Sequence, residues 1–217
     1  MVKVSKARKV IRQALRKWRC GVAFSGGKDS TVLLHLVGQE DDTVPVLFTD
    51  TSVKFAQTYR FIEDLQARWD FPLHTIRTEW EEEIWKNDKA ECCYRLKVEP
   101  FNRLLSDLDL QAVFVGIRRD EHPARAKADY FDHLGAVTHI SEVAWDHWRV
   151  HPLLDWSEED IWEYTRKEEL PANPLYAEGY RSIGCEPCTA LAPEGERSGR
   201  EHDKELVMDR LRRLGYF

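Results

Sequence analysis

A short apolar run ends in Ser-Gly-Gly and continues directly into a helix-like segment, in the stretch VAFSGGKDSTVLL at residues 22–34. Glycine allows positive φ angles and lets the backbone approach a ligand closely. The N-terminus of the following helix points unpaired N–H groups at the same place. Ser25 and Ser30 add hydroxyl donors, and Lys28 adds a positive charge. The stretch therefore predicts a strand–turn–helix unit that binds an anion.

Short apolar runs alternate with longer amphipathic segments along the rest of the chain. We expect strands at residues 20–26, 44–50, 73–78, 112–117 and 137–143, and helices at residues 28–38, 54–69, 81–86, 97–108, 121–131, 158–167 and 200–214. Most strand segments are continuous apolar runs, which is typical of a sheet covered on both faces. The alternation predicts an α/β fold with a doubly wound parallel sheet.

The composition bounds the class of protein. The chain has 217 residues, a formal net charge of −6, 42% hydrophobic and 32% charged residues, as expected for a globular protein with a sizeable core. No apolar run approaches the roughly 20 residues that a membrane span needs, and the basic start does not resemble a secretory signal. We therefore expect a cytoplasmic protein, in which the five cysteines are poor candidates for disulfides.

We divide the chain into three parts by sequence pattern. Residues 1–19 predict a basic amphipathic helix, residues 20–169 the α/β domain, and residues 170–217 a Cys-x-x-Cys loop and a C-terminal helix packed on the same domain. The first part contains no acidic residue, and its apolar residues recur at helical spacing. Its basic face is either solvated or in contact with nucleic acid or an acidic protein partner.

Four cysteines form two close pairs, Cys92 with Cys93 and Cys185 with Cys188. Four thiolates can hold tetrahedral zinc or an iron–sulfur cluster. Adjacent cysteines strain the chain when they bind one metal ion, whereas a cluster presents a separate iron to each. Separate structural or redox cysteines are the alternative. Cys20 opens an apolar strand and is most simply a core residue.

Two further groups of polar residues follow predicted strands. Asp50 and Thr51 end the second strand, where open α/β sheets bind ligands, so they either contact a ribose or adenine or cap the next helix. Arg118, Arg119 and Arg125 follow the fourth strand, and guanidinium groups suit phosphate or sulfate oxygens. The alternative for these arginines is a surface salt-bridge cluster with the acidic residues between them.

The glycine-containing turn matches one nucleotide-binding motif and not two others. Asp29 follows the lysine, where the P-loop needs serine or threonine, and the dinucleotide motif is absent. The turn resembles the pyrophosphate loop, Ser-Gly-Gly-x-Asp-Ser, of the adenine nucleotide alpha-hydrolase group of ATP pyrophosphatases. The resemblance implies that ATP with Mg²⁺ is cleaved between its α and β phosphates. It implies nucleotide contacts from Ser25, Gly26, Gly27, Lys28, Asp29 and Ser30, with Lys28, Ser25 and Asp29 as catalytic residues.

The loop, the two cysteine pairs and the segment GIRRDE at residues 116–121 together are similar to the assimilatory adenylyl-sulfate (APS) reductases, within the wider 3′-phosphoadenylyl-sulfate (PAPS) reductase family. The resemblance spans roughly residues 20–199. It implies a [4Fe–4S] cluster held by Cys92, Cys93, Cys185 and Cys188. Those reductases use a tail cysteine as the nucleophile, and the sequence has no cysteine after Cys188.

Two related groups keep the loop without that tail. The segments TDTSVKF and DWSEEDIWEY look similar to the small subunit of ATP sulfurylase. The ATP pyrophosphatases of DNA phosphorothioate modification resemble the reductases, carry similar cysteines and take sulfur from a cysteine desulfurase. Our sequence-based hypothesis is therefore an ATP pyrophosphatase that activates an acceptor for sulfur insertion. A cysteine desulfurase or other sulfur donor is the expected partner, and the basic helix suits nucleic acid. The alternatives are an APS reductase without the usual tail cysteine and a non-catalytic module that binds nucleotide and cluster.

Overall fold

A computed structural model describes residues 2–135, 145–191 and 195–216 of the chain. These ranges contain a six-stranded sheet with the strand order β3-β2-β1-β4-β6-β5. The strands are β1 Cys20–Ala23, β2 Val46–Asp50, β3 Leu73–Arg77, β4 Ala112–Phe114, β5 Phe131–Leu134 and β6 His147–Val150. Neighbouring strands pair in parallel except β5, which runs antiparallel to β6. The predicted α/β fold with a doubly wound sheet is confirmed.

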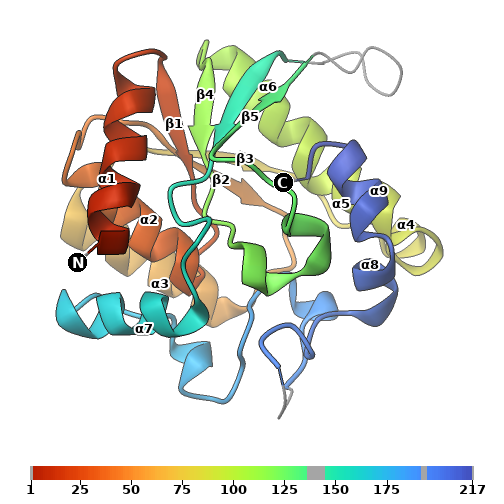
Figure 1. The fold of residues 1–217 in the computed structure, drawn as a ribbon. Coiled ribbons are helices and arrows are strands. Elements are labelled where there is room, and N and C mark those ends of the chain that lie inside the picture. Colours follow the sequence, from red (N-terminus) through yellow and green to blue (C-terminus); the bar gives the residue numbers. More distant parts are fainter. Residues whose placement is uncertain (1, 136–144, 192–194, 217) are drawn as a thin grey trace.

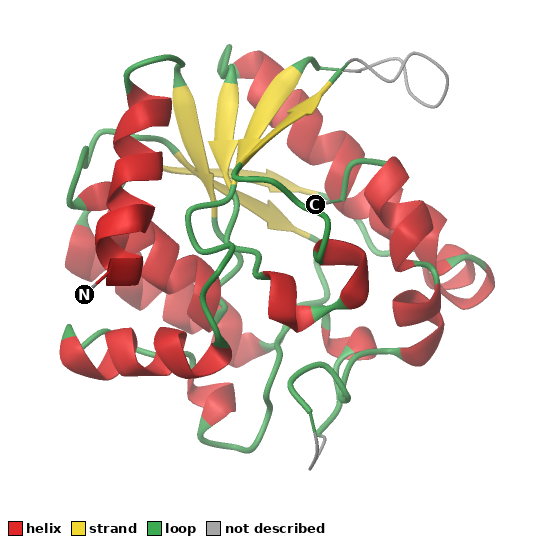
Figure 2. Ribbon diagram, in the orientation of Figure 1, coloured by secondary structure: helices red, strands yellow, loops and turns green. Residues whose placement is uncertain are grey.

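Helices cover both faces of this sheet (Figures 1 and 2). One face packs against α1 Val2–Leu15, α2 Lys28–Gly38, α3 Ala56–Trp69 and α7 Glu158–Lys167. The other face packs against α6 Glu99–Asp107. Successive strand residues alternate between the two sides, since Val46 belongs to the first core cluster and Leu47 to the second. This two-sided burial explains why the strand segments are continuous apolar runs.

The remaining short helices lie around the end of the sheet at which the cysteines are found. They are α4 Glu82–Asn87, α5 Lys89–Cys93, α8 His202–Leu206 and α9 Met208–Arg213. A π-helical turn, Tyr94–Val98, joins α5 to α6 in one continuous helical stretch. Both α8 and α9 contact α5, so the C-terminal segment lies beside the first cysteine pair (Figure 1).

Local sequence signals account for several element boundaries. The hydroxyl of Ser157 accepts from the backbone N–H of Asp160, and the Asp160 carboxylate accepts from the backbone N–H of Ser157 at 2.6 Å. This reciprocal pair is the predicted capping box at the start of α7. In α1 the buried residues recur every three or four positions, as the predicted amphipathic helix requires: Ala7, Val10, Ile11 and Ala14.

One predicted helix is absent from the structure, and another is divided in two. The structure replaces the helix predicted at 121–131 by two 3-10 turns, Arg119–Glu121 and Pro123–Arg125, before the chain enters β5. Proline at the start of the second turn lacks an N–H, which favours a short turn over a continuing helix. The helix predicted at 200–214 divides at Val207 into α8 and α9. The strand predicted at 137–143 lies outside the described residues, and neither β5 nor β6 was predicted.

The basic helix α1 is bound into the fold by its charges. Its side chains form ion pairs with acids of the same domain, namely Lys3–Asp160, Lys6–Asp155 and Arg12–Glu40. These pairs favour a packed helix with a partly solvated basic face, and contact with nucleic acid or an acidic partner stays a prediction. Among the described residues, every helix is too short or too polar to cross a membrane.

The topology locates a ligand crevice. The chain leaves β1 toward β2 on one side and later returns to β4 on the other side of β1, and such switch points are where open α/β sheets bind ligands. The turn at Ser25–Ser30 follows β1, and residues 116–118 follow β4. A Cβ atom on Gly116 would lie 3.2 Å from the carbonyl of Asp29, so glycine permits these two segments to approach closely.

Candidate nucleotide site and cysteine group

The turn at Ser25–Ser30 requires glycine at its second position. Gly26 has a φ of +76°, and a Cβ atom there would lie 3.0 Å from Thr58 Cγ2. Gly27 is the residue before α2 and makes no side-chain cap. The first N–H groups of α2 therefore face the turn without a capping side chain from Gly27, which is the arrangement that favours anion binding.

The two serines of the turn hold each other in place. Ser30 Oγ donates to the carbonyl of Gly27 at 2.9 Å and lies 3.1 Å from Ser25 Oγ. The backbone N–H of Lys28 donates to the hydroxyl of Tyr176 at 2.8 Å. These bonds fix the hydroxyl groups at the mouth of the turn. Tyr176 was not among the predicted site residues, because nothing local in the sequence marks a residue so distant from the turn.

Lys28 is almost fully buried, with 2% of its side chain exposed. Its ammonium group contacts Glu196 and lies 3.3 Å from Asp29 Oδ2. Burial alone lowers the pKa of Lys28, but the negative charges of Asp29 and Glu196 raise it above its ordinary value. Lys28 therefore stays protonated at the turn, but its charge is paired with two carboxylates, so its contact with an anionic ligand stays a prediction.

Arg118 connects the loop after β4 to this turn. Its fully buried guanidinium group donates from Nε to Asp29 at 2.6 Å and from Nη1 to Asp120 at 2.5 Å. Nη2 donates to both carboxylate oxygens of Glu196, at 2.5 and 2.6 Å. The arginine pairs with Asp120, as the salt-bridge alternative predicted, but it does so at the centre of a buried network rather than at the surface. Its contact with phosphate or sulfate stays a prediction.

The other two predicted arginines lie apart from each other. Arg125 is buried and pairs with Glu121, and the nearby charges of Arg125 and Arg118 hold the pKa of the Glu121 carboxyl below its usual range although burial raises it. Arg119 pairs with Asp155 at a partly exposed position. The structure therefore brings Arg118 and Arg125 close to the glycine turn and places Arg119 on the side facing α1.

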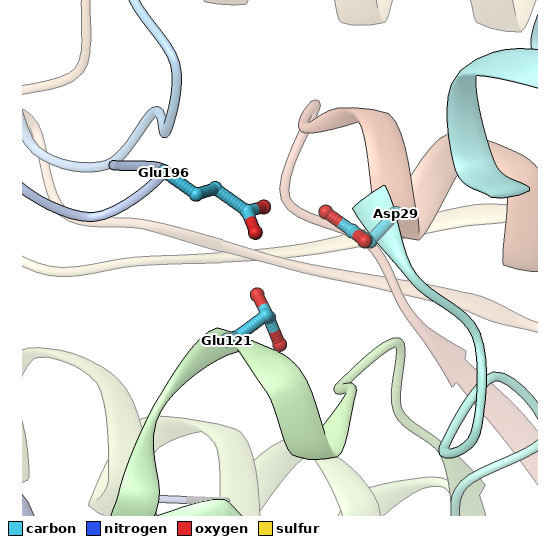
Figure 3. Close-up of side chains that lie close together, drawn as sticks. All are labelled: Asp29, Glu121 and Glu196. Carbon is cyan, nitrogen blue, oxygen red and sulfur yellow. The ribbon is translucent and has the colours of Figure 1, made fainter. Parts of the chain in front are cut away.

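Three carboxylates from distant segments converge beside the turn (Figure 3). Asp29, Glu121 and Glu196 each offer an oxygen atom, and these atoms lie within 4.8 Å of one another. Carboxylate oxygens suit Mg²⁺, but each of the three already accepts from Arg118, Arg125 or Lys28. A divalent ion there would have to replace those cationic contacts.

A cavity of about 260 Å³, called the basic cavity below, extends from the glycine turn. Its lining includes Ser25, Gly27 and Lys28 of the turn. It also includes two acidic residues, Asp29 and Glu121, and six further basic residues, namely Lys54, Lys97, Arg125, Arg149, Arg197 and Arg200. The volume is near the lower limit of small-molecule pockets, about 300 Å³. The charge suits a ligand that carries more than one anionic group.

Asp50 and Thr51 make other contacts in the structure. Asp50 accepts from the hydroxyl of Tyr59 at 2.6 Å and from the backbone N–H of Ser52 at 2.8 Å. It does not cap the next helix, since the residue before α3 is Phe55 and α3 has no side-chain cap. Thr51 Oγ1 lies 3.2 Å from Cys185 Sγ. Among the described residues, the lining of the basic cavity includes Lys54 but neither Asp50 nor Thr51. Their contact with a ribose or adenine stays a prediction.

The four predicted ligand cysteines are all buried and close together. Burial and the neighbouring sulfurs of Cys93, Cys185 and Cys188 raise the pKa of Cys92 to about 12. Four buried thiols from two separate segments suit either tetrahedral zinc or an iron–sulfur cluster, so the cluster ligands stay a prediction. Cys20 lies in the core of β1, as predicted.

Two half-buried lysines, Lys54 and Lys97, join the cysteine group to the basic cavity. Burial raises the pKa of Cys185, but the positive charges of Lys97 and Lys54 outweigh it and lower the pKa to about 6. Lys54 also forms an isolated β-bridge with Cys185. Sequence reasoning missed both lysines, although Lys97 follows Cys93 by four residues, a spacing that would place the two on one face of an α-helix. Trp85 is a further missed neighbour, since its indole N–H donates to Cys188 Sγ at 3.2 Å.

The sheet order, the glycine turn at the switch point and the basic cavity define a pyrophosphate-loop protein of the adenine nucleotide alpha-hydrolase fold. The profile of the phosphoadenosine phosphosulfate reductase domain matches residues 19–191. The chain therefore belongs to the PAPS reductase family, which acts in sulfur metabolism, and the predicted family is confirmed.

Curated relatives agree with this assignment. Adenosine 5′-phosphosulfate reductase 1 of Bacillus subtilis is 34% identical over 190 residues, which cover 82% of this chain and 77% of that protein. The adenosine 5′-phosphosulfate reductase of a Geobacillus species is 31% identical over 205 residues, which cover 88% and 83%. These relatives favour the APS reductase alternative over the ATP pyrophosphatase hypothesis.

Solved structures support the fold alone. The phosphate complex of PAPS reductase from Candida auris superimposes with a TM-score of 0.68 at 24% identity, covering 85% of this chain and 90% of that one. FMN adenylyltransferase of Candida glabrata, solved with FMN and an ATP analogue, gives a TM-score of 0.70 at 23% identity, covering 88% and 65%. Enzymes with different reactions thus share this sheet and its switch point.

Proposed function

We propose that the protein is an adenylyl-sulfate reductase, which converts adenosine 5′-phosphosulfate and a dithiol into AMP, sulfite and a disulfide. The observation that carries the proposal is the position of Lys54 and Lys97. Both side chains line the basic cavity and lie against Cys185, so a nucleotide bound at the glycine turn would lie beside the cysteine group. The names of the curated relatives support the same reaction.

The residues have separate tasks in this proposal. The N–H groups of the glycine turn, together with Ser25, Ser30 and Lys28, bind the phosphate of the nucleotide. Lys97 and Lys54 neutralise the sulfo group, which is joined to that phosphate through one oxygen. One thiol of the reductant attacks sulfur, the bond from sulfur to the phosphate oxygen breaks, and AMP leaves. The second thiol then attacks the sulfur atom that came from the first thiol. This step releases sulfite and forms the disulfide.

The cysteine group suits a [4Fe–4S] cluster, because it offers four buried thiols with positively charged neighbours. Cys92, Cys93, Cys185 and Cys188 would hold the cluster, which would supply a fixed charge beside the sulfo group. Lys97 and Lys54 favour the thiolate form of Cys185 that ligation requires.

The test is an anaerobic assay that measures sulfite from adenosine 5′-phosphosulfate with dithiothreitol and, separately, pyrophosphate from ATP with Mg²⁺. The double variant Ser25→Ala/Lys28→Ala should lose sulfite release. Ser5→Ala/Lys9→Ala, the same pair of changes at exposed positions of α1, should retain it.

The other hypotheses correspond to different outcomes of this assay. Pyrophosphate release without sulfite would support the ATP pyrophosphatase, for which Lys28, Ser25 and Asp29 as catalytic residues, Mg²⁺ and a cysteine desulfurase partner stay predictions. Tight nucleotide binding with neither product would support a non-catalytic module. Either result would overturn the reductase proposal.

A further inference from the structure

The segment after α9 turns back into the basic cavity. Gly215 has a φ of +81°, and a Cβ atom there would lie 2.9 Å from Leu134. The backbone N–H of Tyr216 donates to the carbonyl of Leu211 at 2.9 Å, and the buried guanidinium group of Arg149 donates to the carbonyl of Gly215. The backbone at these two positions is therefore fixed, and it places Tyr216 in the cavity lining.

The phenol of Tyr216 lies among positive charges. Lys204, itself 1% exposed, donates from Nζ to the phenol oxygen at 3.0 Å. The ammonium groups of Lys204 and Lys97 lie 4.8 and 5.8 Å from the centroid of the Tyr216 ring. Because an ammonium group can only donate, the phenol oxygen accepts at this bond, and its O–H is directed away from Lys204.

The electrostatics of the phenol agree with this placement. Burial alone raises the pKa of Tyr216, but the charges of Lys204 and Lys97 outweigh it and lower the pKa to about 7. The phenol is therefore partly ionised near neutral pH. An anion bound beside Tyr216 would be attracted by the same two lysines and would favour the neutral phenol, whose O–H can donate to it.

We propose that Tyr216 is a specificity residue, whose hydroxyl binds, together with Lys97, the second anionic group of a nucleotide whose first phosphate lies at the glycine turn. The inference rests on the proposed function, since it makes that second group the sulfo group of adenosine 5′-phosphosulfate. Lys204 acts through Tyr216 as a positioning residue. The cavity is lined by both the glycine turn and Tyr216, so one ligand can contact both.

The test is a comparison of dissociation constants for AMP and adenosine 5′-phosphosulfate, measured by calorimetry without a reductant. Tyr216→Phe keeps the ring and its contacts with both lysines but removes the hydroxyl. It should weaken the binding of adenosine 5′-phosphosulfate about tenfold, since hydrogen bonds to charged groups are worth that much, and leave AMP within about twofold. Lys204→Met should likewise weaken the binding of adenosine 5′-phosphosulfate and leave the binding of AMP nearly unchanged.

Tyr130→Phe is the matched control, because the Tyr130 hydroxyl donates to Asp155 at 2.6 Å near α1 and not in the basic cavity. It should change neither constant. If Tyr216→Phe weakens the binding of both ligands equally, the residue has a structural role and the inference is overturned. Unchanged dissociation constants for both ligands would also overturn it. If the wild-type protein binds and reduces adenosine 5′-phosphosulfate, such a result leaves the reductase proposal standing. If the wild-type protein does not bind this nucleotide, both proposals fail.

Discussion

Arg118 Nη2 donates to both carboxylate oxygens of Glu196, at 2.5 and 2.6 Å, although 78 residues separate the two in sequence. Through Asp29 the same guanidinium group also contacts the turn that follows β1. One buried side chain thus joins the glycine turn, the loop after β4 and the segment that precedes α8. The integrity of the candidate site depends on this charge.

Removing Arg118 should therefore destabilise the whole fold. Arg118→Met leaves the carboxylates of Asp29, Asp120 and Glu196 close together without their common partner. Breaking a buried pair in this way costs about 3–5 kcal/mol. The neighbouring Arg119→Met removes a pair with about a third of each side chain exposed and should cost about 1 kcal/mol or less. Urea unfolding of the two variants checks the difference, and equal losses would contradict the network.

Gly26 should tolerate no side chain. Gly26→Ala places a methyl group at φ +76° and 3.0 Å from Thr58, so we expect a loss of about 1–3 kcal/mol in stability and weaker AMP binding. Gly38→Ala provides the contrast, since its Cβ would meet no atom within 4 Å at the end of α2. It should stabilise by up to about 1 kcal/mol. Nucleotide titration and urea unfolding together test the pair, and unchanged AMP affinity in Gly26→Ala would argue against the anion-binding role.

The cysteine group makes a prediction about iron. Protein reconstituted with iron and sulfide without oxygen should hold a [4Fe–4S] cluster, detected by iron and sulfide analysis and by visible absorbance. Cys185→Ser should abolish it, because one of the four ligands is lost. Cys20→Ser changes the buried cysteine of β1 and should keep the wild-type iron content. Zinc retained in place of iron would contradict the cluster assignment.

Two buried histidines predict a loss of stability in mild acid. Burial first, and then the charge of Arg149, lower the pKa of His147 to about 4 and that of His151 to about 3, from 6.5. Because these folded-state pKa values lie below the unfolded value, the unfolded state binds protons first as the pH falls. Stability is complete above about pH 6.5 and declines below it.

Each of these two histidines should lower the free energy of unfolding at pH 5.5 by roughly 1 kcal/mol relative to pH 7.5. Urea unfolding at the two pH values measures the decline. His147→Gln removes one titrating ring and should make the decline in stability smaller. An equal decline in the variant and the wild-type protein would show that other groups are responsible.

The sequence alone determined the parts of the site whose residues are neighbours in the chain. The turn at Ser25–Ser30 could be predicted because its glycines, hydroxyl groups and lysine are contiguous, and local conformation follows from local residues. The sheet class and the capping box at Ser157 were predictable for the same reason. The helix predicted at 121–131 was wrong, because its apolar spacing did not reveal the two turns that Pro123 and the buried arginines impose.

Tertiary structure alone decided which distant residues meet at the turn. Glu196 at Lys28, Lys54 at Cys185 and Tyr216 in the basic cavity come from segments that are far from these partners in sequence. Their charges and hydroxyl groups carry no local signal, since a surface lysine and a buried one are the same letter in the sequence. Packing of the helices on both faces of the sheet buries these groups at one end of it. Burial in turn strengthens every charge interaction there, because little water remains to screen it.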